Sequence, residues 1–244
     1  MDARFSEFVG DLARAAGSNL LSVILYGSAA SGEFHARHSD LNLLCLFDRL
    51  DAETLVRINP VTQRWARKGH PPPLVFTASQ LARAADVFAI ELLDIQASHK
   101  VLHGADLVAD LEVPMALHHL EVERELRQNL VRLRERYLAS DGSRKAVLGL
   151  MTASVSSFTV LLRHAVIALE PGGEAPPVRK RDSIDRAAAL IGFEARPFHT
   201  LLDLREGKTL PREVDVDVLF RDYLAAITEV VNQVDLRLEE RSKG

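Results

Sequence analysis

The chain has 244 residues, of which 47% are hydrophobic, so it can bury a sizeable core in one large domain or two small ones. Its 30 Lys and Arg nearly balance 34 Asp and Glu, and a net charge of −4 argues against nucleic acid as a partner. The single cysteine, Cys45, excludes an internal disulfide and favours a reducing compartment. The N-terminal segment lacks the apolar stretch of a signal peptide, and we expect a cytoplasmic protein.

Residues 1–106 alternate between strand-like and helical patterns. Continuous apolar runs at Leu20–Tyr26 and Leu41–Phe47 predict two neighbouring buried strands, and Leu74–Thr77 predicts a third, short strand. Val87–Gly104, with the sequence VFAIELLDIQASHKVLHG, favours a strand followed by a helix. This part is therefore predicted to be an α/β (α+β) domain with a small mixed sheet.

Residues 107–244 are predicted to form an all-α helical-bundle domain. Leucines at helical spacing begin near Leu126, and a last long helix is expected over Val214–Leu238. Ala146–Leu169 is apolar but rich in small polar residues, which indicates a central bundle helix and argues against a membrane span. Arg163 and His164 interrupt it, and they either line a cleft between the domains or pair with an acid of the last helix.

A motif joins the first two predicted strands. The first strand ends at a Gly-Ser turn, and a polar loop leads to Ser-Asp-x-x at the start of the second strand. This arrangement resembles the nucleotidyltransferase superfamily, the polymerase-β-like group that includes aminoglycoside nucleotidyltransferases, whose motif runs Gly-Ser, a spacer, then Asp-x-Asp. The matching residues here are Gly27, Ser28, Gly32, Ser39, Asp40 and Asn42. The resemblance extends more loosely through residue 104 and implies a helical second domain that binds substrate or a partner.

The resemblance implies a nucleotide site built from these residues. Gly27, Ser28 and Ser39 would bind the phosphates of an NTP, because glycine lets backbone amides approach closely and the hydroxyls are donors. Positions 40 and 42 lie on one face of a strand. Carboxylates there would hold Mg²⁺, which aligns a hydroxyl acceptor with the α-phosphate. The implied reaction is transfer of a nucleoside monophosphate from an NTP to a hydroxyl.

The sequence departs from this motif at the metal ligands. Asn42 offers a carbonyl oxygen without charge, and Leu74–Thr77 contains no acid, which leaves Glu91 or Asp94 as the third carboxylate. We expect Asp40, Asn42 and Glu91 to form the catalytic and metal-binding set. The alternative is a catalytically silent relative that binds nucleotide or a protein partner as a regulator. The acceptor and any homo-oligomer are left open by the sequence.

Overall fold

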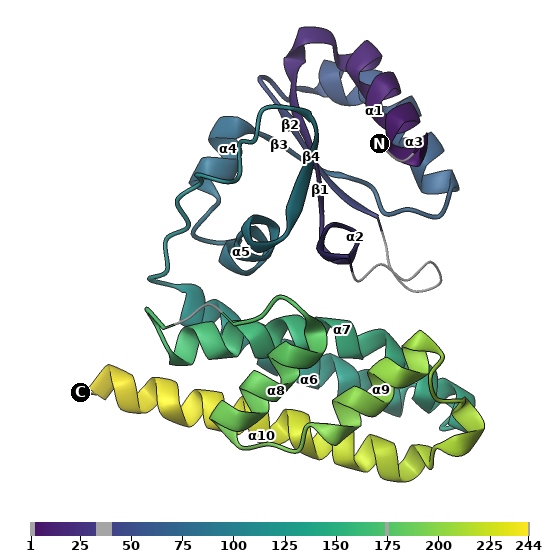
Figure 1. Cartoon of the computed structure of the whole chain (residues 1–244), viewed down its shortest axis with the longest axis vertical. Coiled ribbons are helices and arrows are strands. Elements are labelled where there is room, and N and C mark those ends of the chain that lie inside the picture. Colours follow the sequence, from purple (N-terminus) through teal and green to yellow (C-terminus); the bar gives the residue numbers. More distant parts are fainter. Residues whose placement is uncertain (1–2, 33–40, 174–175, 244) are drawn as a thin grey trace. The chain divides into compact units, whose positions relative to one another are not determined.

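The computed structural model describes residues 3–32, 41–173 and 176–243. The chain divides into two compact units, Met1–Met115 and Ala116–Gly244 (Figure 1). The boundary expected from the sequence, at residue 106, falls in the segment that follows the last strand of the first unit. Each unit is described by itself.

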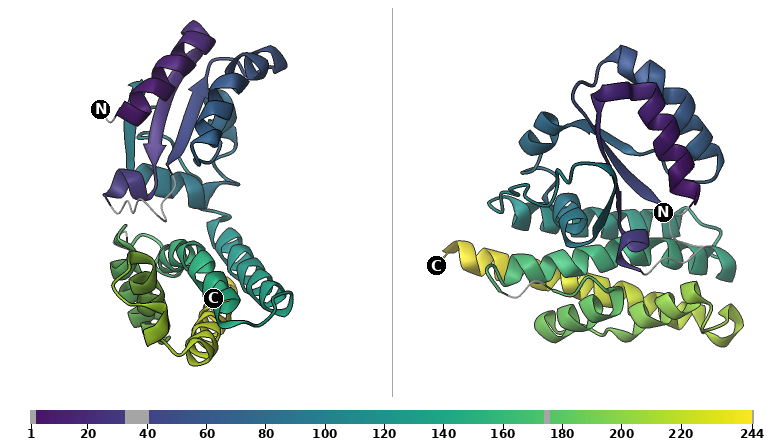
Figure 2. Two further views of the ribbon diagram at one scale, coloured as in Figure 1. Left: turned by 90° about the vertical axis from the view of Figure 1, so that its right-hand side faces the viewer. Right: turned by 45° about the horizontal axis from the view of Figure 1, so that its top comes forward.

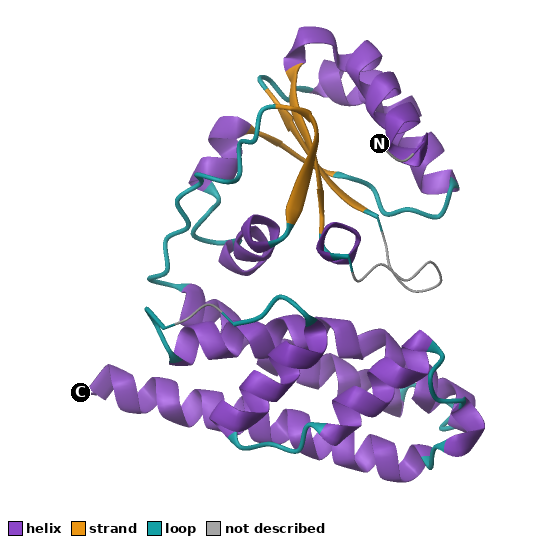
Figure 3. Ribbon diagram, in the orientation of Figure 1, coloured by secondary structure: helices purple, strands orange, loops and turns teal. Residues whose placement is uncertain are grey.

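The first unit has a four-stranded mixed sheet in the order β3-β2-β1-β4 (Figure 3). Strand β1 is antiparallel to both β2 and β4, whereas β2 is parallel to β3. The three strands predicted from apolar runs are confirmed. The elements are α1 (Ala3–Ala16), β1 (Leu20–Tyr26), α2 (Ser28–Ser31), β2 (Asn42–Phe47), α3 (Ala52–Arg67), β3 (Leu74–Thr77), α4 (Ala78–Arg83), α5 (Ala89–Ala97) and β4 (His99–Gly104).

Each face of the sheet is covered by its own apolar core, because successive side chains of a strand point to opposite faces. Helices α1 and α3 lie side by side on one face, and α4 and α5 lie on the other (Figures 1 and 2). Val23 and Leu25 of β1 pack in the α1/α3 core, and Ile24 packs in the α4/α5 core. Tyr26, the last residue of β1, also packs against the α4/α5 core, so its side chain lies on that face.

The order of elements predicted for Val87–Gly104 is wrong. The structure has helix α5 first and strand β4 second. A short apolar run such as AIELLDI satisfies both a buried strand and a buried helix, and here Leu92 and Ile95 pack as one helical stripe against the sheet. Consequently Glu91 lies on a helix and not on a strand beside β2.

The second unit is all-α, as predicted. Its elements are α6 (His118–Leu138), α7 (Arg144–Leu169), α8 (Lys180–Ile191), α9 (Arg196–Glu206), a 3₁₀ turn (Pro211–Glu213) and α10 (Val216–Lys243). By length and composition α7 could cross a membrane, and in the structure it packs against α6, α8, α9 and α10.

The histidine within α7 has a partner that neither sequence alternative included. His164 Nδ1 lies 2.9 Å from Nε2 of His118 on α6, and both side chains are buried. The pair therefore joins α6 to α7 inside the second unit.

Candidate functional site

The Gly-Ser turn brings three of the predicted site residues together. Gly27 has φ 73° and ψ −152°, a conformation that favours glycine, and Ser28 begins the four-residue helix α2 directly after it. A Cβ on Gly27 would lie 3.2 Å from Nδ2 of Asn42, the first residue of β2. Glycine at position 27 thus allows the turn to lie close against the Asn42 amide.

Asn42 belongs to a row of three side chains across the sheet. Tyr26 at the end of β1 pairs with Asn42 on one side and with His99 of β4 on the other. Directly opposed residues of antiparallel strands present their side chains on the same face. The row therefore lies on the α4/α5 face, beside the Gly27 turn.

Glu91 approaches this face from a helix. It is exposed in the first turn of α5, which packs on the same side of the sheet as Tyr26. Burial of the phenol, followed by the negative charge of Glu91 and a smaller effect of Cys45, raises the pKa of Tyr26 to about 12. The carboxylate is therefore close enough to affect Tyr26, although it does not stand on a neighbouring strand.

The remaining predicted ligands are not placed by the structure. Ser39 and Asp40 lie outside the described residues. Strand β3 pairs Val75 with Cys45 and Phe76 with Leu46, so it brings no carboxylate to β2. In the described part of the chain, which does not include Asp40, no three His, Cys, Asp or Glu residues gather as a metal site.

The donors that the structure does place fit a hard cation. Within the described ranges, the Asn42 amide and the Glu91 carboxylate make no hydrogen bond to another protein group. Their oxygens are the ligand type that Mg²⁺ prefers; Asn42 is paired with Tyr26, whose ring packs against the α4/α5 core, and Glu91 is an exposed residue of α5. The Asn42 carbonyl oxygen and the Glu91 carboxylate are therefore not engaged by other groups in the described part of the protein.

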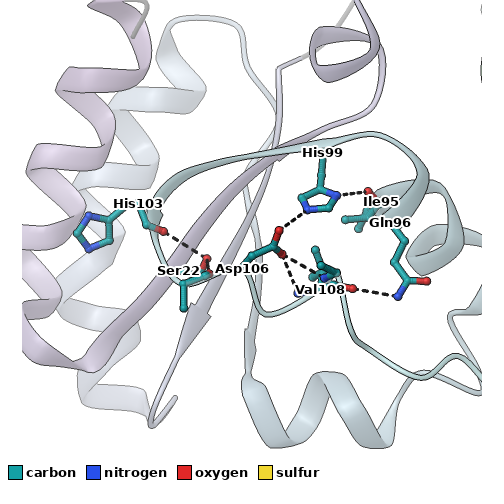
Figure 4. Close-up of polar contacts among 9 residues, drawn as sticks. Ser22, Ile95, Gln96, His99, His103, Asp106 and Val108 are labelled. Carbon is teal, nitrogen blue, oxygen red and sulfur yellow. Dashed lines mark hydrogen bonds and ion pairs between the residues drawn. The ribbon is translucent and has the colours of Figure 1, made fainter.

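The interactions of His99 were not expected from the sequence. Its Nδ1 donates to the Ile95 carbonyl at 3.0 Å, and Nε2 lies 2.9 Å from Oδ2 of Asp106 (Figure 4). The other carboxylate oxygen of Asp106 accepts from the amides of Val108 and Ala109. The sequence signal for this contact was Asp106 at a turn, but its pairing with His99 could not be predicted without the order of α5 and β4.

This arrangement favours the imidazolium form of His99. Both ring nitrogens face acceptors, and only the protonated ring can donate from both. Partial burial opposes the charge, but the hydrogen bond to Asp106 and its negative charge prevail and raise the pKa of His99. The same hydrogen bond lowers the pKa of Asp106, so the pair ties β4 to the loop that follows it.

Comparison with known proteins supports the fold. Neither a family model nor a curated protein sequence matches the chain. The crystal structure of spectinomycin adenyltransferase AAD(9) from Enterococcus faecialis, solved with ATP and spectinomycin, is similar over 97% of this chain and 98% of its own, with a TM-score of 0.51. The fold is that of a nucleotidyltransferase. At 14% identity the similarity extends to the fold and no further.

A second solved structure is less similar. It is a toxin-antitoxin structure with AMP-PNP, matched over 52% of this chain and 97% of its own at 20% identity. Its TM-score of 0.32 is too low to support an argument. The nucleotidyltransferase fold, with a small mixed sheet followed by a helical unit, is therefore supported by AAD(9) and by the observed elements.

Proposed function

We propose that the first unit binds an NTP with Mg²⁺ and transfers its nucleoside monophosphate to a hydroxyl acceptor. The observation that carries this proposal is the position of the Gly27 turn against Asn42, with Glu91 on the helix that covers the same sheet face. The nucleotidyltransferase fold of the chain and the ATP bound to AAD(9) support an NTP as the ligand.

In this proposal each residue has a chemical task. The backbone of Gly27 and the hydroxyls of Ser28 and Ser39 bind the phosphates. Asp40 and Glu91 supply the anionic ligands, and Asn42 a neutral carbonyl ligand. A bound Mg²⁺ would supply positive charge at the phosphates and the leaving pyrophosphate.

The bonds exchanged in this reaction are those of a simple displacement. The acceptor oxygen forms a bond to the α-phosphorus as the bond to pyrophosphate breaks, and the hydroxyl proton passes to a nearby base or to water.

A second candidate function is a silent nucleotide- or protein-binding regulator in the cytoplasm. Three observations favour it: Asn42 carries no charge, β3 carries no acid, and Glu91 stands on an exposed helix turn. With Asp40 and Glu91 as its only charged ligands, the site has less negative charge than the three-carboxylate motif provides for two Mg²⁺ ions.

The substitution Asn42→Asp separates the two functions. It restores a negative charge on the same strand face with almost no change in volume. If the site is otherwise complete, Mg²⁺ affinity should rise by about tenfold or more, and pyrophosphate release from ATP should increase. Titration calorimetry with Mg²⁺ and a pyrophosphate assay, with spectinomycin among the trial acceptors, measure both effects.

The control for this substitution is Asn129→Asp, which adds the same charge on α6 of the second unit. It should leave both readings unchanged. No gain in either metal affinity or turnover for Asn42→Asp would contradict the catalytic proposal and support the silent regulator.

A further inference from the structure

The phenol of Tyr26 is left without a protein partner beside the Gly27 turn. Its ring packs against the α4/α5 core, yet within the described ranges its hydroxyl makes no hydrogen bond to another protein group. By contrast, the buried phenol of Tyr223 lies 3.1 Å from Oγ of Ser154. Tyr26 is half-buried, and its hydroxyl is not one of the described buried polar atoms that lack a partner, so solvent reaches it and a ligand beside the turn can use it as a donor.

The neighbours of Tyr26 show where that ligand would lie. On one side, His99 has both ring nitrogens occupied, by Ile95 and Asp106. On the other side, the Asn42 amide is unoccupied in the described part of the molecule and lies against the Gly27 turn. The open polar groups of the row are therefore the two nearest the turn.

The protonation state of Tyr26 limits what it can do. The hydroxyl of an ordinary tyrosine keeps its proton at neutral pH, because the phenol titrates only at about pH 10. A neutral phenol is a hydrogen-bond donor and a poor base or nucleophile. Beside a turn proposed to bind phosphate, the matching acceptor is a phosphate oxygen.

We infer that the Tyr26 hydroxyl donates a hydrogen bond to a phosphate oxygen of the nucleotide bound at the Gly27–Ser28 turn. This inference rests on the proposed nucleotide site and adds to it a residue that positions the phosphates. The residue precedes the Gly-Ser motif, so the turn and the donor are fixed by consecutive backbone positions at the end of β1.

Tyr26→Phe tests the inference because it removes the hydroxyl and keeps the ring. Loss of a hydrogen bond to a charged phosphate should weaken MgATP binding by about tenfold or more in titration calorimetry. Adenosine, which lacks phosphate, should bind to the variant as it binds to the parent. The matched control is Tyr137→Phe in α6, which should leave MgATP affinity unchanged.

The outcomes distinguish this inference from the proposal beneath it. Failure of the parent protein to bind MgATP overturns the proposed site and the inference together. If the parent binds MgATP and Tyr26→Phe binds it equally well, the inference alone is overturned. An equal loss of MgATP and adenosine affinity also overturns it, because a packing defect or a base contact would act on both ligands.

Discussion

Acidification from pH 7 to pH 4 should destabilise the second unit through His118. This imidazole is 1% exposed and shares a hydrogen bond with His164. Burial, together with the charges of His164 and His119, lowers the pKa of His118 from 6.5 to about 4. The unfolded chain therefore binds this proton at a higher pH than the folded chain, and stability falls as the pH falls between these two values.

The size of this effect follows from the two pKa values. At 1.36 kcal/mol for each pKa unit, the free energy of unfolding should fall by about 2 kcal/mol at pH 5 and about 3 kcal/mol at pH 4. Above pH 6.5 the contribution is fully present. Because other groups titrate in the same range, the effect must be read as a difference between two proteins.

Urea unfolding followed by far-UV circular dichroism provides the measurement. The parent and His118→Gln are compared at pH 7, 6, 5 and 4, since Gln retains an amide for the hydrogen bond to His164 and does not titrate. Relative to the variant, the parent should lose about 3 kcal/mol between pH 7 and pH 4. Parallel stability curves for the two proteins would show that protonation of His118 does not destabilise the second unit.

Two further predictions concern the first unit. Asp106→Asn should lower the pKa of His99 in an NMR titration. Folding raises the pKa of His99 and lowers that of Asp106, so the pair stabilises the fold below the usual His pKa and above the usual Asp pKa. The parent should therefore exceed the variant in stability most between about pH 4 and 6.5. This stability difference should be about 1 kcal/mol or less, since the Asp106 side chain is 37% exposed and screened by water. An unchanged titration of His99 would contradict the pairing with Asp106. Gly104→Ala should cost more than about 3 kcal/mol, because the new Cβ would lie 1.9 Å from the Leu21 carbonyl oxygen at φ 75°. The control is Gly69→Ala, at φ 88° with open space around it, which should lower the free energy of unfolding by about 1 kcal/mol in the same denaturation assay. Equal losses of stability in the two variants would show that the contact with Leu21 is unimportant.

Much of the fold could be predicted from local sequence patterns. Leu20–Tyr26 and Leu74–Thr77 were predicted with the observed bounds, because a buried strand is a short apolar run ended by turn residues. Val87–Gly104 could not be assigned in the same way. Its apolar run fits either element, and only packing of α5 against the sheet decides between them.

For the candidate site, too, local sequence predicts some residues, whereas others depend on packing. Gly27 and Asn42 could be related from the sequence, because they lie at adjoining ends of two neighbouring strands. Glu91 could not, since its position depends on how α5 packs. Tyr26 was not among the predicted site residues although it precedes the motif, because the role proposed for it follows from cross-strand neighbours that the sequence does not display.

The most direct test of the proposed nucleotide site is titration calorimetry of ATP with and without Mg²⁺ on the parent and on Asp40→Ala. Because Asp40 is the retained carboxylate of the motif, we expect the parent to bind ATP more tightly with Mg²⁺ and the variant to fold normally but lose this dependence. Absence of ATP binding by the parent, or the same Mg²⁺-dependent binding by Asp40→Ala, would contradict the proposed site.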